Sequence, residues 1–320
     1  MAGVVDLSAL TKYTDELAID LISKAVLKGR TADTGITIQP DVKYKAALNI
    51  MNSTLTAQAT SCGISATGSV ALSQRDLEVC PLTIFEDVCL NDLEQYWAGK
   101  LMRAGSYNEQ IPFEQLYTED KVNKMQALIE DLFWKGSKDG NDVTGAGAAS
   151  GNLALCDGVL DILQFTSATS SVLTPGTTAS FTKATAIDII DSIINKFNSD
   201  ATDALGEENI NIYISYPNFT LLTQALRDAN YFHYDANQGD FRINGYLGTQ
   251  FNVIAVRGLN GSNRIVMTPA ANLYMGTDLL NDYETFEVFY HQKDDKVYFR
   301  SKWKIGAQVA FPEFVVLYNV

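Results

Sequence analysis

Apolar residues recur at steps of three and four in several stretches of the chain, which is the spacing of an amphipathic helix. The clearest case lies between Thr118, a residue type that caps helix starts, and Gly136, a residue type that ends helices. Another helical pattern ends at Gly29. The predicted helices span 8–28, 91–103, 118–135, 187–197 and 217–230.

A pattern of period two, typical of an extended strand or hairpin, runs through Ile64, Ala66, Gly68, Val70 and Leu72. It lies within 46–74, where 29 consecutive residues carry no charged side chain. Natural edge strands are usually guarded by Lys or Pro, because an unguarded edge pairs with other chains. We therefore expect this segment to lie on a neighbouring subunit.

The second half of the chain alternates between helical and strand patterns, and its last third reads as β. The segment 141–182 is low in complexity and reads as loops around a short apolar piece at 159–165. Strands are predicted at 210–216, 246–256, 264–274, 286–291, 297–304 and 307–318. The sum is an α+β fold, with a long-helix region before a mixed domain.

Composition adds one unusual feature, a low content of charged residues. Of 320 residues 46% are hydrophobic, but only 19% are charged, below the roughly 25% of a typical soluble domain. The shortage is concentrated in 46–74 and 141–182, which together hold three charged side chains, Asp142, Asp157 and Asp161. A surface poor in charge is a poor surface for a lone monomer. This favours a protein that is covered by partners.

The 38 acidic and 24 basic side chains give a net charge of −14, and the basic residues form no run, which argues against a nucleic-acid reader. No apolar window is long enough to span a membrane, and Asp15, Glu16 and Asp20 argue against a secretory signal. We expect the four cysteines to be free, mostly buried thiols, and we expect no zinc site. The cysteines are Cys62, Cys80, Cys89 and Cys156.

For each of four kinds of candidate site, a structural interpretation is favoured over a functional one. The glycine cluster at 145–151 has no lysine, which favours a linker over a phosphate loop. His233 and His291 are set among aromatics without a nucleophile signature, which favours core or turn positions. Paired acids such as Glu86-Asp87 point in different directions on a strand. Tyr96-Trp97 and Phe133-Trp134 favour core or subunit contacts. We expect no catalytic, cofactor-binding or metal-binding residues, and a structural protein rather than an enzyme.

Five segments of the C-terminal half match sequence patterns of one known protein family. Gly245-Tyr-Leu-Gly248-Thr-Gln-Phe251 is similar to a strand entry of that family, with Phe251 where proline is usual. The remaining resemblances are Ser215-Tyr216-Pro217 before a helix, Asn272-Leu-Tyr-Met-Gly276-Thr-Asp278, Tyr290 to Tyr298, and Phe299-Arg-Ser-Lys-Trp303-Lys-Ile-Gly306-Ala-Gln-Val309-Ala-Phe311-Pro312. The last matches a strand of the form R-x-x-W/R-x-x-G-x-x-V. Together these segments resemble the major capsid proteins of tailed bacteriophages.

The resemblance implies a Hong Kong 97-type capsid fold. It predicts an N-terminal arm over 1–45 and an extension loop over 46–85. It places a peripheral domain with a long spine helix in 86–165 and 281–320, and an axial domain in 166–280. These bounds are implied by the family pattern and by the order of the elements.

The resemblance also implies a function. Such subunits assemble with themselves as pentamers and hexamers into an icosahedral shell around double-stranded DNA, without sequence-specific contact to that DNA. A separate scaffolding protein, a portal and possible decoration proteins are the expected partners, and no membrane is involved. The expected location is the virion, after assembly in the host bacterial cytoplasm. The alternatives are an encapsulin-like nanocompartment shell, an extracellular or surface structural protein and, last, an enzyme.

Overall fold

A computed structural model describes most of the chain. The described residues are 30–58, 68–89, 113–166, 169–177, 179–207, 209–229, 241–278, 285–293 and 296–320. The predicted helices at 8–28 and 91–103 therefore lie outside the described residues, as do Cys62, Tyr96-Trp97 and His233.

The first sheet is organised around one long strand, β11 (Lys296–Val309), which pairs with three others. Every second side chain of β11 from Val297 to Ile305 is buried, and the residues between them are half-buried. A strand with this alternation has one face in a core. The other members are β1 (Thr37–Gln39), β4 (Cys80–Cys89), β9 (Leu273–Thr277) and β10 (Thr285–His291).

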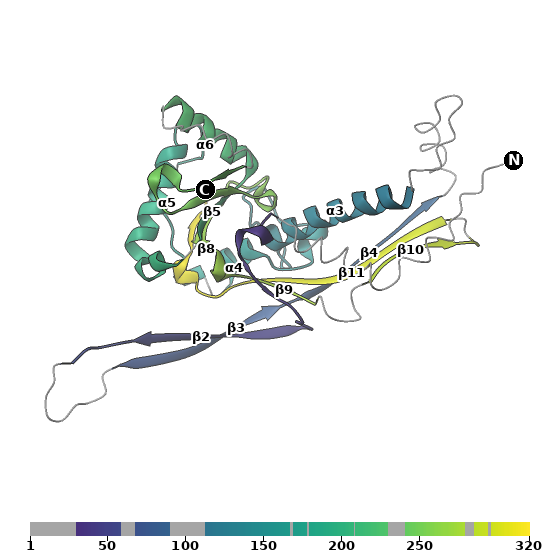
Figure 1. Cartoon of the computed structure of the whole chain (residues 1–320), viewed down its shortest axis with the longest axis horizontal. Helices are drawn as coiled ribbons and strands as arrows, with labels where there is room; N and C mark the ends of the chain where they lie inside the picture. The colour runs from purple at the N-terminus through teal and green to yellow at the C-terminus, as the bar shows by residue number, and fades with distance from the viewer. Residues whose placement is uncertain are drawn as a thin grey trace.

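Helix α3 (Phe113–Lys135) runs along this sheet, as Figure 1 shows. Its buried residues Met125, Ile129, Leu132 and Phe133 join the buried side chains of β11 in one core. The predicted helix was confirmed, but it begins at Phe113 rather than after Thr118. The described helix begins at the residue that follows Pro112 in the sequence, and proline is compatible with a helix start because the first N–H groups have no intrahelical partner.

The second sheet is the core of a compact α/β lobe, in the order β12-β8-β5-β7-β6. Helices α5 (Ala186–Asp200) and α6 (Tyr216–Asp228) pack in this lobe (Figure 1) and contact each other, and both confirm predicted helices. The short apolar piece is α4 (Val159–Phe165), in the core shared with α3. The strands are β5 (Ile210–Ile214), β6 (Arg242–Ile243), β7 (Asn252–Ala255), β8 (Ile265–Pro269) and β12 (Val316–Tyr318).

Several of the predicted strands were wrong in their limits. The predicted strand 246–256 is extended only over β7, because a short turn of helix at Tyr246–Gly248 precedes it. The segment 264–274 is not one strand, because β8 ends at Pro269 and a short turn of helix precedes β9. Conversely, the segments 297–304 and 307–309 belong to one strand, and a short turn of helix at Pro312–Phe314 separates β11 from β12 within the predicted strand 307–318. The chain stays extended through Gly306 until Val309, because residues from Ile305 onward pair with β9.

The third sheet is a two-stranded hairpin of β2 (Lys45–Thr54) and β3 (Ser69–Glu78). The prediction of an extended hairpin was confirmed for these two strands, and Ile64 and Ala66 of the predicted pattern lie outside the described residues. Figure 1 shows that the hairpin projects away from the body of the molecule. Among the described residues, its root near Lys45 and Glu78 is the part that lies against the rest of the chain.

A buried polar network joins the segment before β1 to helix α3 and to the second sheet. The Thr31 hydroxyl donates to Glu130 Oε1 at 2.9 Å and accepts from Trp134 Nε1 at 2.9 Å. Thr34 Oγ1 lies 2.9 Å from the Tyr213 hydroxyl of β5. All five side chains are buried, so each polar atom in the network depends on its partner. The network fixes α3 relative to the α/β lobe.

Substitution of Glu130 by Gln is expected to make the protein less sensitive to pH. Burial raises the pKa of Glu130 above its ordinary value of 4.5, and the bond from Thr31 only partly offsets this. The folded state therefore favours the protonated carboxyl, and this stabilisation is lost as the pH rises through the raised pKa. The Gln variant, which stays neutral, should gain thermal stability over the wild type at pH 7 to 8.

The gain should shrink toward pH 4.5, where the wild-type carboxyl is also protonated. Thermal unfolding of both proteins across this pH range measures it. Glu207→Gln, at an exposed position, controls for the loss of a carboxylate. A stability difference between Glu130→Gln and wild type that does not change with pH would contradict this account.

Candidate assembly surface

The tip of the β2–β3 hairpin exposes an apolar face. Met51 and Leu72 are opposite each other in the pairing register, and Val70 follows on the same face two residues along β3. Their exposed fractions are 66%, 78% and 65%. Leu55, just beyond β2, is 94% exposed. We call these four residues the hairpin tip face, and it is a contiguous apolar surface on a segment that contains no charge.

The root of the hairpin is held by a small apolar core of its own. Leu77 and Val79 are buried against Val42 and Leu48, with Ala46 and Tyr274 partly buried around them. The amide of Val79 donates to the Tyr44 carbonyl at 3.0 Å, and that of Val42 donates to Thr277 at 3.2 Å. The root is therefore fixed to the first sheet, whereas the tip is not.

Two glycines of the first sheet make room for this root. Gly276 of β9 and Gly306 of β11 are opposite each other in the register. A Cβ at Gly306 would lie 2.0 Å from the Glu78 carbonyl oxygen, and one at Gly276 would lie 2.8 Å from a Val79 methyl carbon. Real Cβ atoms do not approach so closely, so the root can lie here only because both residues lack a side chain.

Polar side chains of β11 complete the attachment. Lys304 Nζ donates to the buried Asp278 carboxylate at 2.7 Å and to the Lys43 carbonyl at 2.9 Å. Gln308 Nε2 donates to the Asp76 carbonyl at 2.6 Å. Lys304, Gly306 and Gln308 belong to the capsid-like sequence motif, and Asp278 ends its second segment. In this chain these residues hold the hairpin.

We expect Lys304→Met to destabilise the folded subunit by about 3 to 5 kcal/mol, because it removes the ammonium group that is paired with the buried Asp278 carboxylate. The matched control is Lys45→Met, which breaks the exposed pair of Lys45 with Glu78 at the same root. An exposed pair contributes at most about 1 kcal/mol. Denaturant unfolding of the two variants measures the difference, and equal losses would contradict the role of Lys304.

The acidic pair Glu86-Asp87 shows why neighbouring acids do not form a site. Glu86 pairs with Lys121 of α3, and Asp87 pairs with Lys296 of β11. Asp87 and Lys296 lie at partly exposed positions, and the Lys296 ion pair lowers the pKa of Asp87. The two carboxylates are therefore directed to opposite faces of β4 and serve as separate ion pairs.

The glycine cluster at 145–151 forms a loop in which backbone N–H groups bind the carboxylate of the nearby Asp142. The Gly145 amide donates to the Asp142 carboxylate at 2.8 Å. Although burial raises the pKa of Asp142, the backbone N–H groups of the loop more than offset it, so the net pKa is lowered. The amides of residues 144–147 are thus engaged by the Asp142 carboxylate within the loop.

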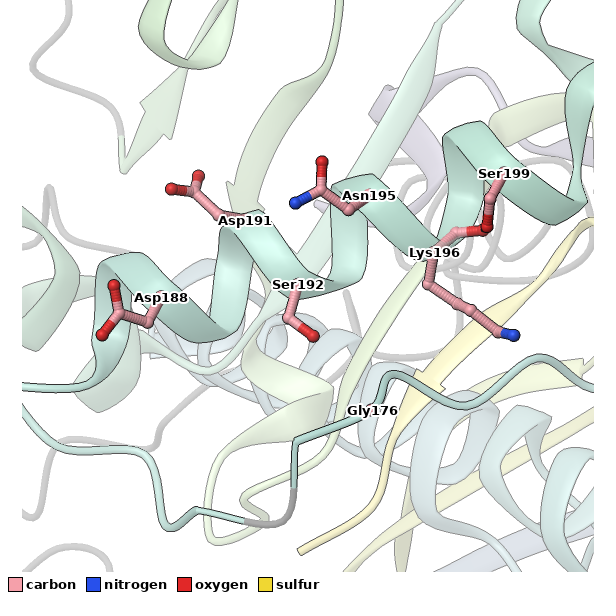
Figure 2. Close-up of a pocket in the computed structure, with 7 residues that line it drawn as sticks. All are labelled: Gly176, Asp188, Asp191, Ser192, Asn195, Lys196 and Ser199. Carbon is pink, nitrogen blue, oxygen red and sulfur yellow. The ribbon is translucent and has the colours of Figure 1, made fainter.

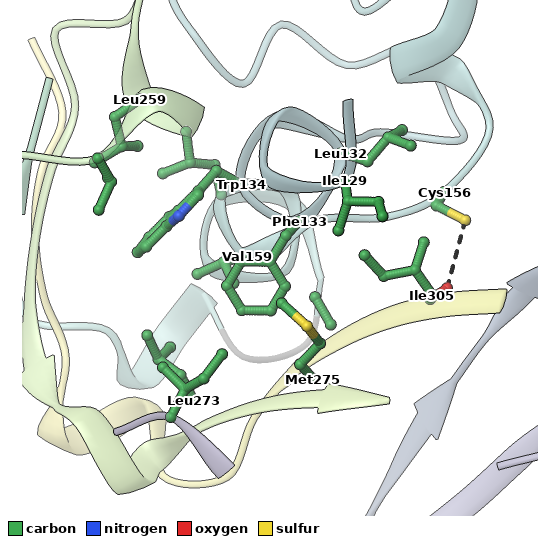
Figure 3. Close-up of a cluster of buried hydrophobic side chains, with 14 of the residues drawn as sticks. Ile129, Leu132, Phe133, Trp134, Cys156, Val159, Leu259, Leu273, Met275 and Ile305 are labelled. Atoms are coloured by element: carbon green, nitrogen blue, oxygen red, sulfur yellow. Dashed lines mark hydrogen bonds between the residues drawn. The ribbon is translucent and has the colours of Figure 1, made fainter. Parts of the chain in front are cut away.

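The other sequence candidates are ordinary structural positions. Phe133 and Trp134 are fully buried in the core around α3 (Figure 3), which confirms the prediction of core contacts. His291 is exposed at the end of β10, where its ring meets Tyr298 edge to face. It lies beside a turn rather than in the core.

A hollow of about 470 Å³ lies along α5, between that helix and Gly176. Figure 2 shows that its polar side chains do not converge, because Asp191 and Asn195 project to one side of the helix and Asp188 and Ser192 to the other. Burial, together with the charge of Asp188, raises the pKa of Asp191. Groups that diverge in this way do not form an acid–base pair around one substrate atom.

Searches for two further kinds of site gave negative results within the part of the chain that the structure describes. These residues include no group of three or more His, Cys, Asp or Glu side chains placed to hold a metal ion. The described helices include none with the length and apolar character needed to cross a membrane.

The prediction of free cysteines was wrong for two of them. Cys80, at the start of β4, and Cys156, before α4, form a disulfide with their Cα atoms 5.9 Å apart. The two residues are 76 positions apart, so no local spacing pointed to this pair. Cys89 is free and half-buried.

Comparison with known proteins supports a capsid fold. No model of a protein family matches the sequence, and no curated protein matches it. Among solved structures, the chain resembles one described as "Satellite phage P4 procapsid including size determination (Sid) protein". The TM-score is 0.57 and the identity is 13%, over 94% of this chain and 98% of that chain.

Two other structures extend the likeness. The capsid of Myoviridae phage XM1 has a TM-score of 0.56 and 11% identity, over 90% of both chains. A virus-like particle from Pyrococcus furiosus has a TM-score of 0.52 and 13% identity, over 95% of this chain and 98% of that chain. The shared architecture is that of capsid proteins. More specifically, the chain has the fold of tailed-phage major capsid proteins, which confirms the predicted α+β fold class.

Proposed function

We propose that this chain is the major capsid protein of a tailed bacteriophage, and that it assembles as pentamers and hexamers into an icosahedral shell around double-stranded DNA. The observation that carries the proposal is the hairpin tip face, because four exposed apolar side chains stand on an uncharged hairpin away from the body. Such a surface is stabilised when other copies of the chain cover it.

An extended hairpin suits the geometry of a closed shell. Subunits of an icosahedral shell meet their neighbours in several slightly different environments. Main-chain hydrogen bonds and non-directional apolar contacts tolerate small changes of angle between subunits. Rigid attachment at the root and freedom at the tip support a hairpin that reaches across to a neighbour.

The domain division follows from the same proposal. We assign an arm to 1–45, an extension loop to 46–85, a peripheral domain to 86–165 and 281–320, and an axial domain to 166–280. The hairpin strands end at Glu78, and β4 then pairs with β11 in the first sheet. The extension loop is therefore anchored through residues 80–85.

The proposed partners are other copies of the chain, a separate scaffolding protein, a portal and possible decoration proteins. Assembly takes place in the host bacterial cytoplasm, and the product is the virion shell. Contact with packaged DNA is non-specific. The net charge of −14 supports this, because an acidic wall repels phosphate groups and does not bind them tightly.

A nanocompartment shell is a second candidate function. The likeness to the Pyrococcus furiosus virus-like particle covers 98% of that chain and favours this alternative. The subunits would assemble into a shell in the same way in a nanocompartment and in a virion. The difference lies in the contents, protein cargo in a nanocompartment and DNA in a virion.

Electron microscopy of the expressed protein tests the proposal, with the contents of nuclease-treated particles analysed after disruption. Expressed alone, the chain should form shells, tubes or capsomer rings. Particles formed together with the other phage proteins should protect double-stranded DNA. Protein cargo without DNA would favour the nanocompartment, and dispersed 35.1 kDa subunits at high concentration would contradict both functions.

A further inference from the structure

The Cys80–Cys156 disulfide lies where the hairpin meets the body. Strand β3 ends at Glu78, and Cys80, two residues later, is the first residue of β4. In the first sheet Cys80 is opposite Ile305, next to Gly306, which makes room for the hairpin root. A covalent bond at Cys80 therefore acts on the hairpin root directly.

The other end of the bond lies on a rigid support. A Cβ at Gly136 would lie 2.3 Å from the Cys156 carbonyl oxygen, so the Cys156 backbone is packed against the end of α3. The Gly158 amide donates to the Gly136 carbonyl at 2.8 Å and ties the same two segments together. The disulfide thus connects the hairpin root to the C-terminal end of the long helix.

The surroundings suit both oxidation states of the pair. Cys156 is buried, and its sulfur lies 3.8 Å from the Ile305 carbonyl oxygen, as Figure 3 shows. A reduced Cys156 thiol can donate its weak hydrogen bond to that carbonyl. Cys80 is half-buried, which leaves a small oxidant or reductant a route to the pair.

We propose that Cys80 and Cys156 form a redox-controlled lock on the hairpin root. The proposal rests on the proposed function, in which subunits assemble in a reducing cytoplasm and the particle is later released into an oxidising medium. A low-molecular-weight disulfide such as oxidised glutathione serves as the oxidant. The two cysteine thiols lose two protons and two electrons and become joined, and the small disulfide becomes two small thiols.

The lock acts after folding, by fixing an arrangement that the fold has already built. With reduced thiols, the root is held by its apolar core and by Lys304 and Gln308. Oxidation adds a covalent loop closed across 76 residues, which restricts the unfolded chain and raises thermal stability. Assembly thus proceeds with the pair reduced, and the released particle becomes more stable.

The test begins with particles purified under a phosphine reductant. One half is kept reduced, and the other is exposed to oxidised glutathione. Both are denatured without further reduction, alkylated and analysed by peptide mass spectrometry. All four cysteines should be alkylated in the reduced half. In the oxidised half only Cys62 and Cys89 should be alkylated, and a linked peptide should contain Cys80 and Cys156. Alkylation of all four after oxidation, or a link through Cys89, would overturn the proposal.

Thermal unfolding supplies a second readout. Oxidation should raise the melting temperature of wild type and of the control Cys89→Ser, and should not raise that of Cys80→Ser or Cys80→Ala. An equal rise in all four would overturn the lock. Electron microscopy of the same samples distinguishes a failure of the redox-controlled lock from a failure of the proposed shell function. Shells without the linked peptide refute the lock alone, and the linked peptide in dispersed subunits refutes the shell function alone.

Discussion

Substitution of Leu72 by Asp is expected to abolish particle formation while the subunit itself remains folded. The Leu72 side chain is 78% exposed on the hairpin tip face and contributes little to the isolated subunit. Burial of one such side chain in a contact stabilises by about 1.5 to 3 kcal/mol, and a carboxylate in the same place must lose its hydration. Since every subunit of a shell repeats the contact, the loss recurs around the whole particle.

The control for this prediction is Ser73→Asp, which adds the same charge one residue along β3 on the opposite face of the hairpin. We expect Ser73→Asp to assemble at concentrations where Leu72→Asp does not. Sedimentation velocity of the two variants and the wild type measures assembly. Thermal unfolding should place both subunits within about 2 °C of the wild type, since surface changes usually alter stability by less than about 0.5 kcal/mol. Normal particles from Leu72→Asp would show that the hairpin tip face makes no shell contact.

Gly306→Ala should both destabilise the folded subunit and prevent its assembly. The new Cβ would lie 2.0 Å from the Glu78 carbonyl oxygen and 2.9 Å from the Glu78 carbonyl carbon, which are both backbone atoms. The hairpin root must move away, and its small apolar core and the bond from Gln308 to Asp76 are lost with it. We expect a loss of about 3 kcal/mol or more, together with failure to assemble.

A loss of stability in Gly306→Ala would be informative, because replacing Gly by Ala in a strand interior ordinarily stabilises a protein by about 0.5 to 1 kcal/mol. Gly176→Ala provides the control, since a Cβ there meets no atom within 4 Å. Calorimetry should show a melting temperature lowered by roughly 5 °C or more for Gly306→Ala and little change for Gly176→Ala. If Gly306→Ala instead melts at the wild-type temperature, the hairpin root does not depend on the space that Gly306 provides.

Local patterns predicted those elements whose stability comes from one apolar face. Helices α5 and α6 and most of α3 follow from the spacing of their buried residues, and the hairpin follows from its period of two. Limits that depend on tertiary contacts were missed. Gly306 does not interrupt β11, because the residues that follow Ile305 pair with β9, and a single sequence does not reveal that pairing.

The candidate surface was only partly visible in the sequence. The absence of charge over 46–74 indicated a segment suited to contact with a neighbour, and the structure exposes Met51, Val70 and Leu72 there. The residues of the root were not identified as a unit, because Lys304 and Gly306 lie in β11 whereas Asp278 follows the end of β9. The Cys80–Cys156 pair was missed for the same reason, since 76 residues separate its members.

The most direct test of the account is a cryo-electron microscopy reconstruction of the particles that the purified chain forms. The account predicts a closed shell in which the tip of each β2–β3 hairpin lies on an adjacent subunit and Met51, Val70 and Leu72 are covered. A sample of dispersed 35.1 kDa subunits, or a shell in which each hairpin tip stays exposed to solvent, would contradict it.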